Sequence, residues 1–182
     1  MPAAPTVPAT ASGTLIPIVA LPQDDLLTVS DRDIPLLKNA FGEGASFQPL
    51  RLDLETNTWV LIATFSPGVT MPIHYHTGPA EVYTLAGSWH YVEYPDQPQT
   101  AGSYLYEPGG SVHTLRVPET NTEDTIAFIR VEGANINFYE DGSFHSILDA
   151  VFLEAITHDL AAAQGVAPIR YLRGNEHAYA GD

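Results

Sequence analysis

The sequence predicts a single all-β domain with one helix on either side of the strands. Between Phe47 and Tyr139, short runs rich in β-branched and aromatic residues alternate with Gly, Pro, Asn and Asp. This spacing is typical of an antiparallel sandwich or barrel and not of a parallel sheet with crossover helices. The chain of 182 residues is long enough for one domain with a sizeable core, and its apolar fraction of 45% is ordinary for a globular protein.

The first residues form an uncharged segment. Residues 1–14 are mostly Ala, Pro and Thr, a composition that buries too little surface to order itself. We therefore expect a flexible arm over residues 1–14 and a single domain over residues 15–182. After the arm, "SDRDIPLLKNAFG" predicts a short N-terminal helix. Ser30 or Asp31 can cap this helix, and Gly42 can end it. Its apolar face would consist of Ile34, Leu37 and Phe41.

The barrel strands are expected between about residues 45 and 140. In chain order the β-rich runs are "FQPLRLDL", "TWVLIATFSP", "AEVYTLAG", "SWHYVEYP", "GSYLYEPGG", "VHTLRVP", "TIAFIRVEG" and "INFYE". A C-terminal helix is then expected over about residues 146–164, with Gly165 as its stop signal. Its expected apolar stripe is Ile147, Val151, Leu153, Ile156 and Leu160. This helix and the arm favour a homo-oligomer, a dimer or a tetramer.

Charge and composition exclude several classes of function. Seven Lys and Arg against 22 Asp and Glu give a formal charge of −15, which repels nucleic acid and anionic membranes. The absence of cysteine excludes disulfides, zinc–thiolate sites and thiol nucleophiles, so histidine and carboxylate side chains must carry any metal chemistry. Because no signal segment and no apolar run of roughly 18 residues stands out, we expect a cytoplasmic protein.

Two histidines one residue apart suggest such a metal site. Residues 67–87, "PGVTMPIHYHTGPAEVYTLAG", contain His74 and His76, which point to the same face if the segment is a strand. His113 follows a Pro-Gly-Gly turn that can bring a neighbouring strand back across the same barrel mouth. Imidazole nitrogens suit iron, zinc, copper and nickel ions. The remaining histidines are expected to be surface or core residues: His90, His145, His158 and His177.

The spacing of these residues resembles the cupin superfamily. Its first motif is matched by Gly68, His74, His76 and Gly87, and its second by Gly102, Pro108, Gly110 and His113. The resemblance implies a single cupin jelly-roll barrel, also called a double-stranded β-helix, with one metal ion held inside.

The sequence departs from the cupin pattern at the fourth ligand. The family usually has a Glu with six residues between it and the last Gly of the first motif, and counting back from Gly87 puts Ala80 at that position. Glu81 has an acceptable spacing from His76 but is one residue too close to Gly87. Because neighbouring strand residues face opposite sides, we expect Ala80 to face the cavity and leave a three-histidine site. Glu81 is the reserve ligand if a bulge shifts the register.

Among cupins, the stretches "HYHTGP", "YTLAGSWHYVEY" and "GSYLYEPGGSVHTL" resemble the 2,4'-dihydroxyacetophenone dioxygenases and, more loosely, the acetylacetone dioxygenases. This resemblance implies one mononuclear Fe(2+) per subunit, held by His74, His76 and His113. It also implies cleavage of a carbon–carbon bond of an aromatic α-hydroxyketone with O2, giving 4-hydroxybenzoate and formate. Neutral ligands leave the ion's charge uncompensated, which favours an anionic bidentate substrate.

Such a reaction needs a base near the metal. Glu93 is the candidate on a strand position facing the cavity, and Glu107 is the candidate for orienting a histidine or a water. Two alternatives to the hydroxyketone dioxygenase remain open. One is another enzyme on the same site, such as a β-diketone dioxygenase or an isomerase using Zn, Ni or Mn. The other is a non-catalytic cupin that senses a small molecule.

Overall fold

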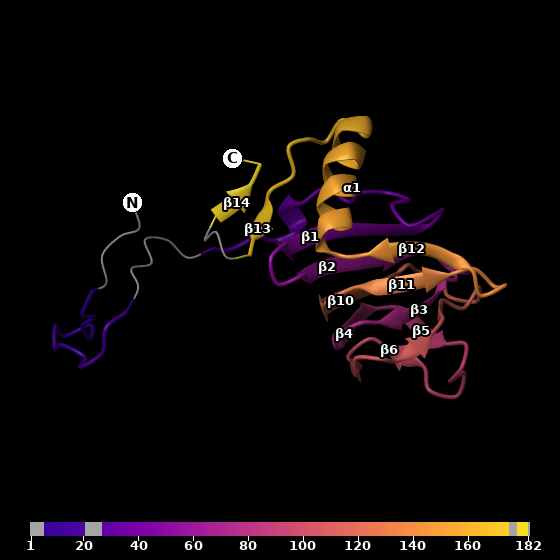
Figure 1. Ribbon diagram of the computed structural model, residues 1–182, viewed down its shortest axis with the longest axis horizontal. Helices are drawn as coiled ribbons and strands as arrows, with labels where there is room; N and C mark the ends of the chain where they lie inside the picture. The colour runs from indigo at the N-terminus through magenta and orange to yellow at the C-terminus, as the bar shows by residue number, and fades with distance from the viewer. Residues whose placement is uncertain (1–5, 21–26, 175–177, 182) are drawn as a thin grey trace.

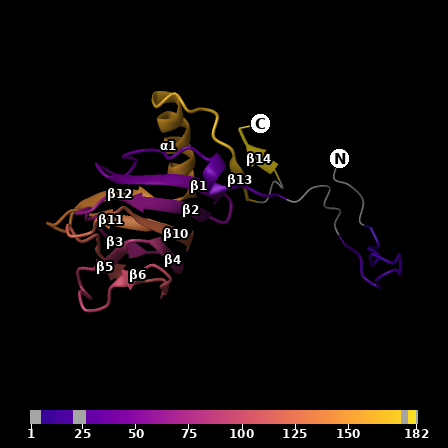
Figure 2. The same cartoon turned by 180° about the vertical axis from the view of Figure 1, so that it is seen from behind.

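The chain folds into a β-barrel with an α-helix at its side (Figures 1 and 2). The computed structural model describes residues 6–20, 27–174 and 178–181. The prediction of an all-β jelly-roll barrel is confirmed. The elements are β1 (Ala45–Asp53), β2 (Thr58–Phe65), β3 (Ile73–His76), β4 (Ala80–Ala86), β5 (Ser88–Tyr91), β6 (Gln99–Thr100), β7 (Tyr104–Glu107), β8 (Val112–His113), β9 (Leu115–Arg116), β10 (Thr125–Glu132), β11 (Asn135–Phe138), β12 (Phe144–Leu148), α1 (Ala150–Ala163), β13 (Tyr171–Arg173) and β14 (Ala178–Ala180).

Two sheets enclose the interior. The larger has the strand order β14-β13-β1-β2-β10-β4-β7, and the smaller has the order β12-β11-β3-β8. A short third sheet, β6-β5-β9, covers one end. All neighbouring strands in the two barrel sheets are antiparallel except β1 and β13, so the predicted antiparallel barrel is observed.

Strand parity decides which side chains reach the interior. In β4 the buried residues are Ala80, Val82 and Thr84, whereas the residues between them are half-buried or exposed. Because side chains alternate across a strand, the first group faces the smaller sheet and the second faces outward. The same alternation in β3 buries His74 and His76 and exposes Tyr75.

The predicted N-terminal helix is present only as a single turn. A 3-10 helix, η1 (Asp31–Asp33), begins after Ser30, whose hydroxyl accepts a hydrogen bond from the Arg32 amide at 3.3 Å. Ile34 is already extended, with ψ of 117°, because the ring of Pro35 disfavours a helical conformation in the residue before it. The chain then continues as an irregular segment held to β1 by hydrogen bonds between Leu37 and Phe47.

The C-terminal helix starts later than predicted. Residues up to Leu148 belong to β12, and the carboxylate of Asp149 caps α1 by accepting a hydrogen bond from the Phe152 amide at 2.8 Å. The predicted apolar stripe is correct at Leu153, which is buried, but Val151 is 58% exposed. The buried face of α1 is made mostly of small side chains and packs against β1 and β12: Ala150, Leu153, Thr157 and Ala161.

In the part of the chain that the structure describes, only the C-terminal end adds strands to the barrel. The tail after α1 extends the larger sheet, because β13 pairs in parallel with β1 and β14 pairs with β13. Within the expected arm, residues 6–20 fold back on themselves through bridges between Thr6 and Ala20 and between Ala9 and Leu15. Residues 1–5 of that arm lie outside the described residues. Among the described residues, no helix has the length and apolarity needed to cross a bilayer.

Candidate metal centre

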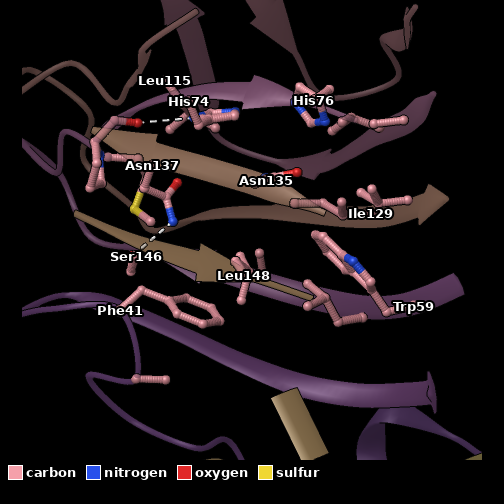
Figure 3. Close-up of a pocket in the computed structure, with 18 of the residues that line it drawn as sticks. Phe41, Trp59, His74, His76, Leu115, Ile129, Asn135, Asn137, Ser146 and Leu148 are labelled. Atoms are coloured by element: carbon pink, nitrogen blue, oxygen red, sulfur yellow. Dashed lines mark hydrogen bonds between the residues drawn. The ribbon is translucent and has the colours of Figure 1, made fainter. Parts of the chain in front are cut away.

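A cavity of about 380 Å³ lies between the two barrel sheets (Figure 3). The wall from the larger sheet is apolar apart from Glu107 and includes Trp59, Leu61, Ala80, Val82, Ile129 and Val131. The wall from the smaller sheet is largely polar and includes His74, His76, Asn135, Asn137 and Ser146. A small molecule in this cavity would therefore contact hydrogen-bonding groups on one side and hydrocarbon on the other.

The structure brings His74, His76 and His113 together. Each offers one ring nitrogen, and these three atoms lie within 4.8 Å of one another. The reason is strand register: His74 and His76 share the inner face of β3, and His113 of β8 lies directly opposite His74. All three side chains are buried.

The spacing of two of these nitrogens fits ligands of a single cation. The Nε2 atoms of His76 and His113 are 3.0 Å apart. Two ligands about 2.1 Å from one ion and at right angles to each other would be about 3.0 Å apart. His74 has its Nδ1 2.9 Å from the Pro72 carbonyl oxygen, which can only accept, so Nδ1 carries the proton and Nε2 keeps a free lone pair.

Burial keeps His74 suitable as a ligand. Burial lowers the pKa of this imidazole to about 4, and the neighbouring rings of His76 and His113 act in the same direction. The hydrogen bond to Pro72 and the carboxylate of Glu107 oppose the change but do not cancel it. The ring of His74 is therefore neutral at physiological pH, the state that metal coordination requires.

Glu107 is the carboxylate that reaches the histidines. Its Oε2 is 2.9 Å from Nε2 of His76 and 3.4 Å from Nε2 of His113, and its side chain is 4% exposed. Burial alone would raise its pKa, but hydrogen bonds with His113 and His76 outweigh that effect and hold the pKa of Glu107 well below its usual range. The group is an anion beside the candidate metal position, close enough to bind the ion directly or to bind a ligand of it.

The position of Glu107 explains how the site has a carboxylate although Ala80 replaces the usual one. Ala80 of β4 lines the cavity, is 1% exposed and lies directly opposite Glu107 of β7. Because Ala80 has only a methyl group, the longer side chain of Glu107 can extend past it to the imidazoles. Glu81 points to the outer face, as the parity argument predicts, and its Oε1 is 3.5 Å from Nη1 of Arg130.

Tyr91 holds two of these groups in place. Its ring stacks on that of His113, with centroids 3.8 Å apart and an angle of 18° between the planes. Its hydroxyl donates a hydrogen bond to Oε1 of Glu107. Burial and the adjacent carboxylate raise the pKa of Tyr91 well above its usual value, so it remains a donor.

The expectation that Glu93 faces the cavity is wrong. Strand β5 ends at Tyr91, whose side chain takes the inward position, and Glu93 is an exposed residue beyond the strand. Its carboxylate accepts hydrogen bonds from the amide and the hydroxyl of Thr114, each at 2.9 Å. Glu93 thus fixes the backbone next to His113 without reaching the cavity.

Several polar cavity residues were not among the predicted site residues. Asn135 and Asn137 of β11 lie directly opposite His76 and His74 in the register. Asn137 donates a hydrogen bond to Ser146 at 3.0 Å, and Nδ1 of His145 is 2.7 Å from the same hydroxyl. His145 is an exposed residue, as expected, and it also lines the cavity. The alternation of Asn with apolar residues in "NINF" was the signal that could have identified the two Asn residues.

Solved structures share this fold. A protein of unknown function with a cupin-like fold from Ralstonia eutropha JMP134 is 39% identical, with a TM-score of 0.80 over 87% of this chain and 98% of that chain. An RmlC-like cupin from the same organism is 24% identical, with a TM-score of 0.72 over 79% of this chain and 92% of the other. An acetylacetone dioxygenase from Acinetobacter johnsonii is 19% identical, with a TM-score of 0.61 over 74% of this chain and 91% of the other. The last two show similarity of fold alone.

The sequence also matches a family model. The ChrR cupin-like domain matches residues 27–134, which is more than half of the chain and includes all three clustered histidines. Among proteins of curated function, none matches the chain significantly. The matched segment, the jelly-roll barrel and the 39% identical structure agree, and the chain belongs to the ChrR cupin-like domain family of the cupin superfamily.

Proposed function

We propose that the protein is a non-haem iron dioxygenase that cleaves a carbon–carbon bond of an aromatic α-hydroxyketone. The observation that carries this proposal is the cluster of three buried imidazoles, two of which line a cavity whose opposite wall is apolar. Ferrous iron bound there would supply a Lewis acid for the ketone and hydroxyl oxygens and the electrons for O2 activation. The single-cation fit of the ring nitrogens supports one ion per subunit.

The cavity favours a compact substrate with one aromatic ring. Its volume of about 380 Å³ is at the lower end of the range for small-molecule sites. Trp59 and Leu61 offer a flat hydrocarbon surface to the ring. On the other side, Asn137, Ser146 and His145 form a connected polar group that can bind a ring hydroxyl. These features agree with 2,4'-dihydroxyacetophenone as substrate.

The proposed reaction balances without another reactant. One hydroxyketone and one O2 give 4-hydroxybenzoate and formate, with both oxygen atoms of O2 retained in the two carboxylates and two protons released at neutral pH. In this reaction the protein must hold the substrate in the cavity and accommodate its negative charge. The carboxylate of Glu107 lies beside the Nε2 atoms of His76 and His113 that would face the iron, so we assign it binding of the ion or of a ligand of the ion.

A β-diketone dioxygenase is the second candidate, because the acetylacetone dioxygenase from Acinetobacter johnsonii shares the fold. A small diketone has no hydroxyl for the polar group around Ser146, so the cavity suits it less well.

One experiment separates these functions. Purified protein is loaded with ferrous iron or with zinc, its metal content is measured, and O2 uptake is recorded with 2,4'-dihydroxyacetophenone and with acetylacetone. We expect uptake with the hydroxyketone on the iron form only, and loss of uptake in His113→Ala. Faster uptake with acetylacetone would favour the second candidate. No uptake with either substrate on fully iron-loaded protein would overturn both and favour a sensing role.

We also propose that the protein forms a homo-oligomer. The outer face of β4 and β7 exposes four large apolar or aromatic side chains: Tyr83, Leu85, Tyr104 and Tyr106. In residues 6–20 four further apolar side chains are at least half exposed, and this segment carries no charged residue in a chain of net charge −15: Val7, Leu15, Ile18 and Val19. Light scattering should give a dimer or tetramer, and a monomer at micromolar concentration would contradict the proposal.

A further inference from the structure

Two buried polar atoms next to the metal centre have no hydrogen-bond partner within the described part of the chain. They are Nδ1 of His76 and Oδ1 of Asn135. The two residues belong to neighbouring strands, and Asn135 of β11 is paired directly with His76 of β3. Their exposed fractions are 9% for Asn135 and 2% for His76, so water cannot readily replace the missing partners.

The two side chains lie within reach of each other. Directly opposite residues of an antiparallel pair project to the same face with Cβ atoms about 4.5–5.5 Å apart. Both residues line the cavity, and Figure 3 shows them on its polar side. Neither Oδ1 of Asn135 nor Nδ1 of His76 has a partner in the present side-chain conformations, so a hydrogen bond between them requires rotation about the side-chain bonds.

Metal binding would determine which of these two atoms donates the hydrogen bond and which accepts it. If His76 binds an ion through Nε2, that nitrogen gives up its proton and Nδ1 must carry one. A proton on a buried Nδ1 needs an acceptor, and the amide oxygen of Asn135 can only accept. His74 already follows this rule, because its Nδ1 donates to the Pro72 carbonyl oxygen at 2.9 Å.

We propose that Asn135 is a positioning residue for the metal centre. In the metal-bound protein its Oδ1 accepts a hydrogen bond from Nδ1 of His76, which fixes the ring orientation and keeps the Nε2 lone pair directed at the ion. The proposal rests on the metal site of the proposed function, but not on the substrate or on O2 chemistry.

Ser111 is the competing acceptor. Its hydroxyl is also buried without a partner, and its carbonyl oxygen accepts a hydrogen bond from the His76 amide at 3.0 Å. A hydroxyl can donate as well as accept, so it would not enforce one tautomer of His76. Asn135 also lines the cavity, whereas Ser111 is not among its lining residues. For these reasons we assign the role to Asn135.

Zinc binding to the full-length protein tests the proposal. Affinity is measured by competition with a chromophoric chelator, and the ring N–H protons of the zinc-loaded protein are observed by NMR with 15N-labelled histidine. In Asn135→Leu we expect zinc affinity to fall about 10–100-fold and the His76 Nδ1 proton to exchange rapidly. Asn135→Asp retains an acceptor oxygen and adds a negative charge, so we expect its zinc affinity to be no weaker than that of the wild type.

Two control variants and a second test variant complete the design. Asn137→Leu alters the same residue type on the same strand, but Asn137 is paired with His74, whose Nδ1 already has the Pro72 carbonyl oxygen as its partner. The zinc affinity of this variant should therefore change less than about threefold. Ser111→Ala should leave both readouts unchanged. Asn135→Ala is measured beside Asn135→Leu because it removes the amide without adding bulk, and circular dichroism verifies that each variant is folded.

The outcomes are distinguishable. Wild-type affinity in Asn135→Ala and Asn135→Leu, or an effect of Ser111→Ala in their place, would overturn the assignment while leaving the metal site intact. Failure of the wild-type protein to bind zinc at all would overturn the metal site and this inference together. Failure of O2 uptake alone would overturn the proposed reaction and would not affect the role of Asn135.

Discussion

Replacing Glu107 by Gln tests the carboxylate that approaches the three histidines. The substitution keeps the size of the side chain and its ability to accept a hydrogen bond from Tyr91, but it removes the negative charge 2.9 Å from Nε2 of His76. A group at this distance, with only 4% of its side chain exposed, is poorly screened by solvent.

The expected effect on metal affinity is large. Loss of a group that binds or orients ligands typically weakens metal binding about 10–100-fold, which corresponds to about 1.4–2.8 kcal/mol. In the metal-free protein, two buried hydrogen bonds to an anion become weaker bonds to a neutral amide, and the free energy of unfolding should fall by about 1–3 kcal/mol. Chelator competition with zinc measures the first quantity, and urea unfolding of metal-free protein measures the second.

Glu81→Gln is the matched control. Glu81 occupies the neighbouring position to Ala80 on β4 but faces outward, at 3.5 Å from Arg130 with 38% of its side chain exposed. Exposed ion pairs contribute up to about 1 kcal/mol, so its stability should change little and its zinc affinity not at all. Unchanged metal binding in Glu107→Gln, or weakened binding in Glu81→Gln, would refute the assignment of the carboxylate to Glu107.

Three further predictions concern stability. In metal-free protein the pKa of His74 falls from 6.5 to about 4 on folding, so between these pH values only the unfolded chain binds this proton. The free energy of unfolding should therefore decrease by about 3 kcal/mol as the pH falls from 6.5 to 4. Urea unfolding of His74→Phe should show a weaker pH dependence. Asp149→Ala should lower the free energy of unfolding by about 1 kcal/mol through loss of the helix cap, whereas Asp159→Ala, in the middle of the same helix, should not. Ala80→Glu places a second buried carboxylate opposite Glu107 and should destabilise metal-free protein by about 3 kcal/mol or more; thermal unfolding should show recovery when Glu107→Ala is added, and no recovery would contradict the shared position.

Local patterns in the sequence predicted most of the strands between β1 and β11 and the three-histidine cluster, but not β12, β13 or β14. His74 and His76 are two residues apart on one strand, so parity alone puts them on the same face. Parity also decided between Ala80 and Glu81, since one faces the cavity and the other faces Arg130. In both cases the alternation of side chains along one strand was enough for the prediction.

Features that depend on pairing between distant strands were harder to predict. The approach of Glu107 to His76 depends on the register of β7 against β4, and the position of Asn135 depends on that of β11 against β3. Glu93 was misplaced because β5 ends two residues before it, after Tyr91. The expected N-terminal helix failed for a local reason, the effect of Pro35 on Ile34, which the apolar spacing concealed.

The contrast between the two cavity walls has a consequence for how this protein can diversify. Residues such as Leu61 and Ile129 determine how much room a guest molecule has, and they come from strands that contribute none of the clustered histidines. Substitutions that change side-chain volume on β2 or β10 can therefore alter the size of the molecule that fits in the cavity, while the histidine-bearing strands β3 and β8 remain unchanged. Relatives with altered preferences are expected to differ first along those two strands.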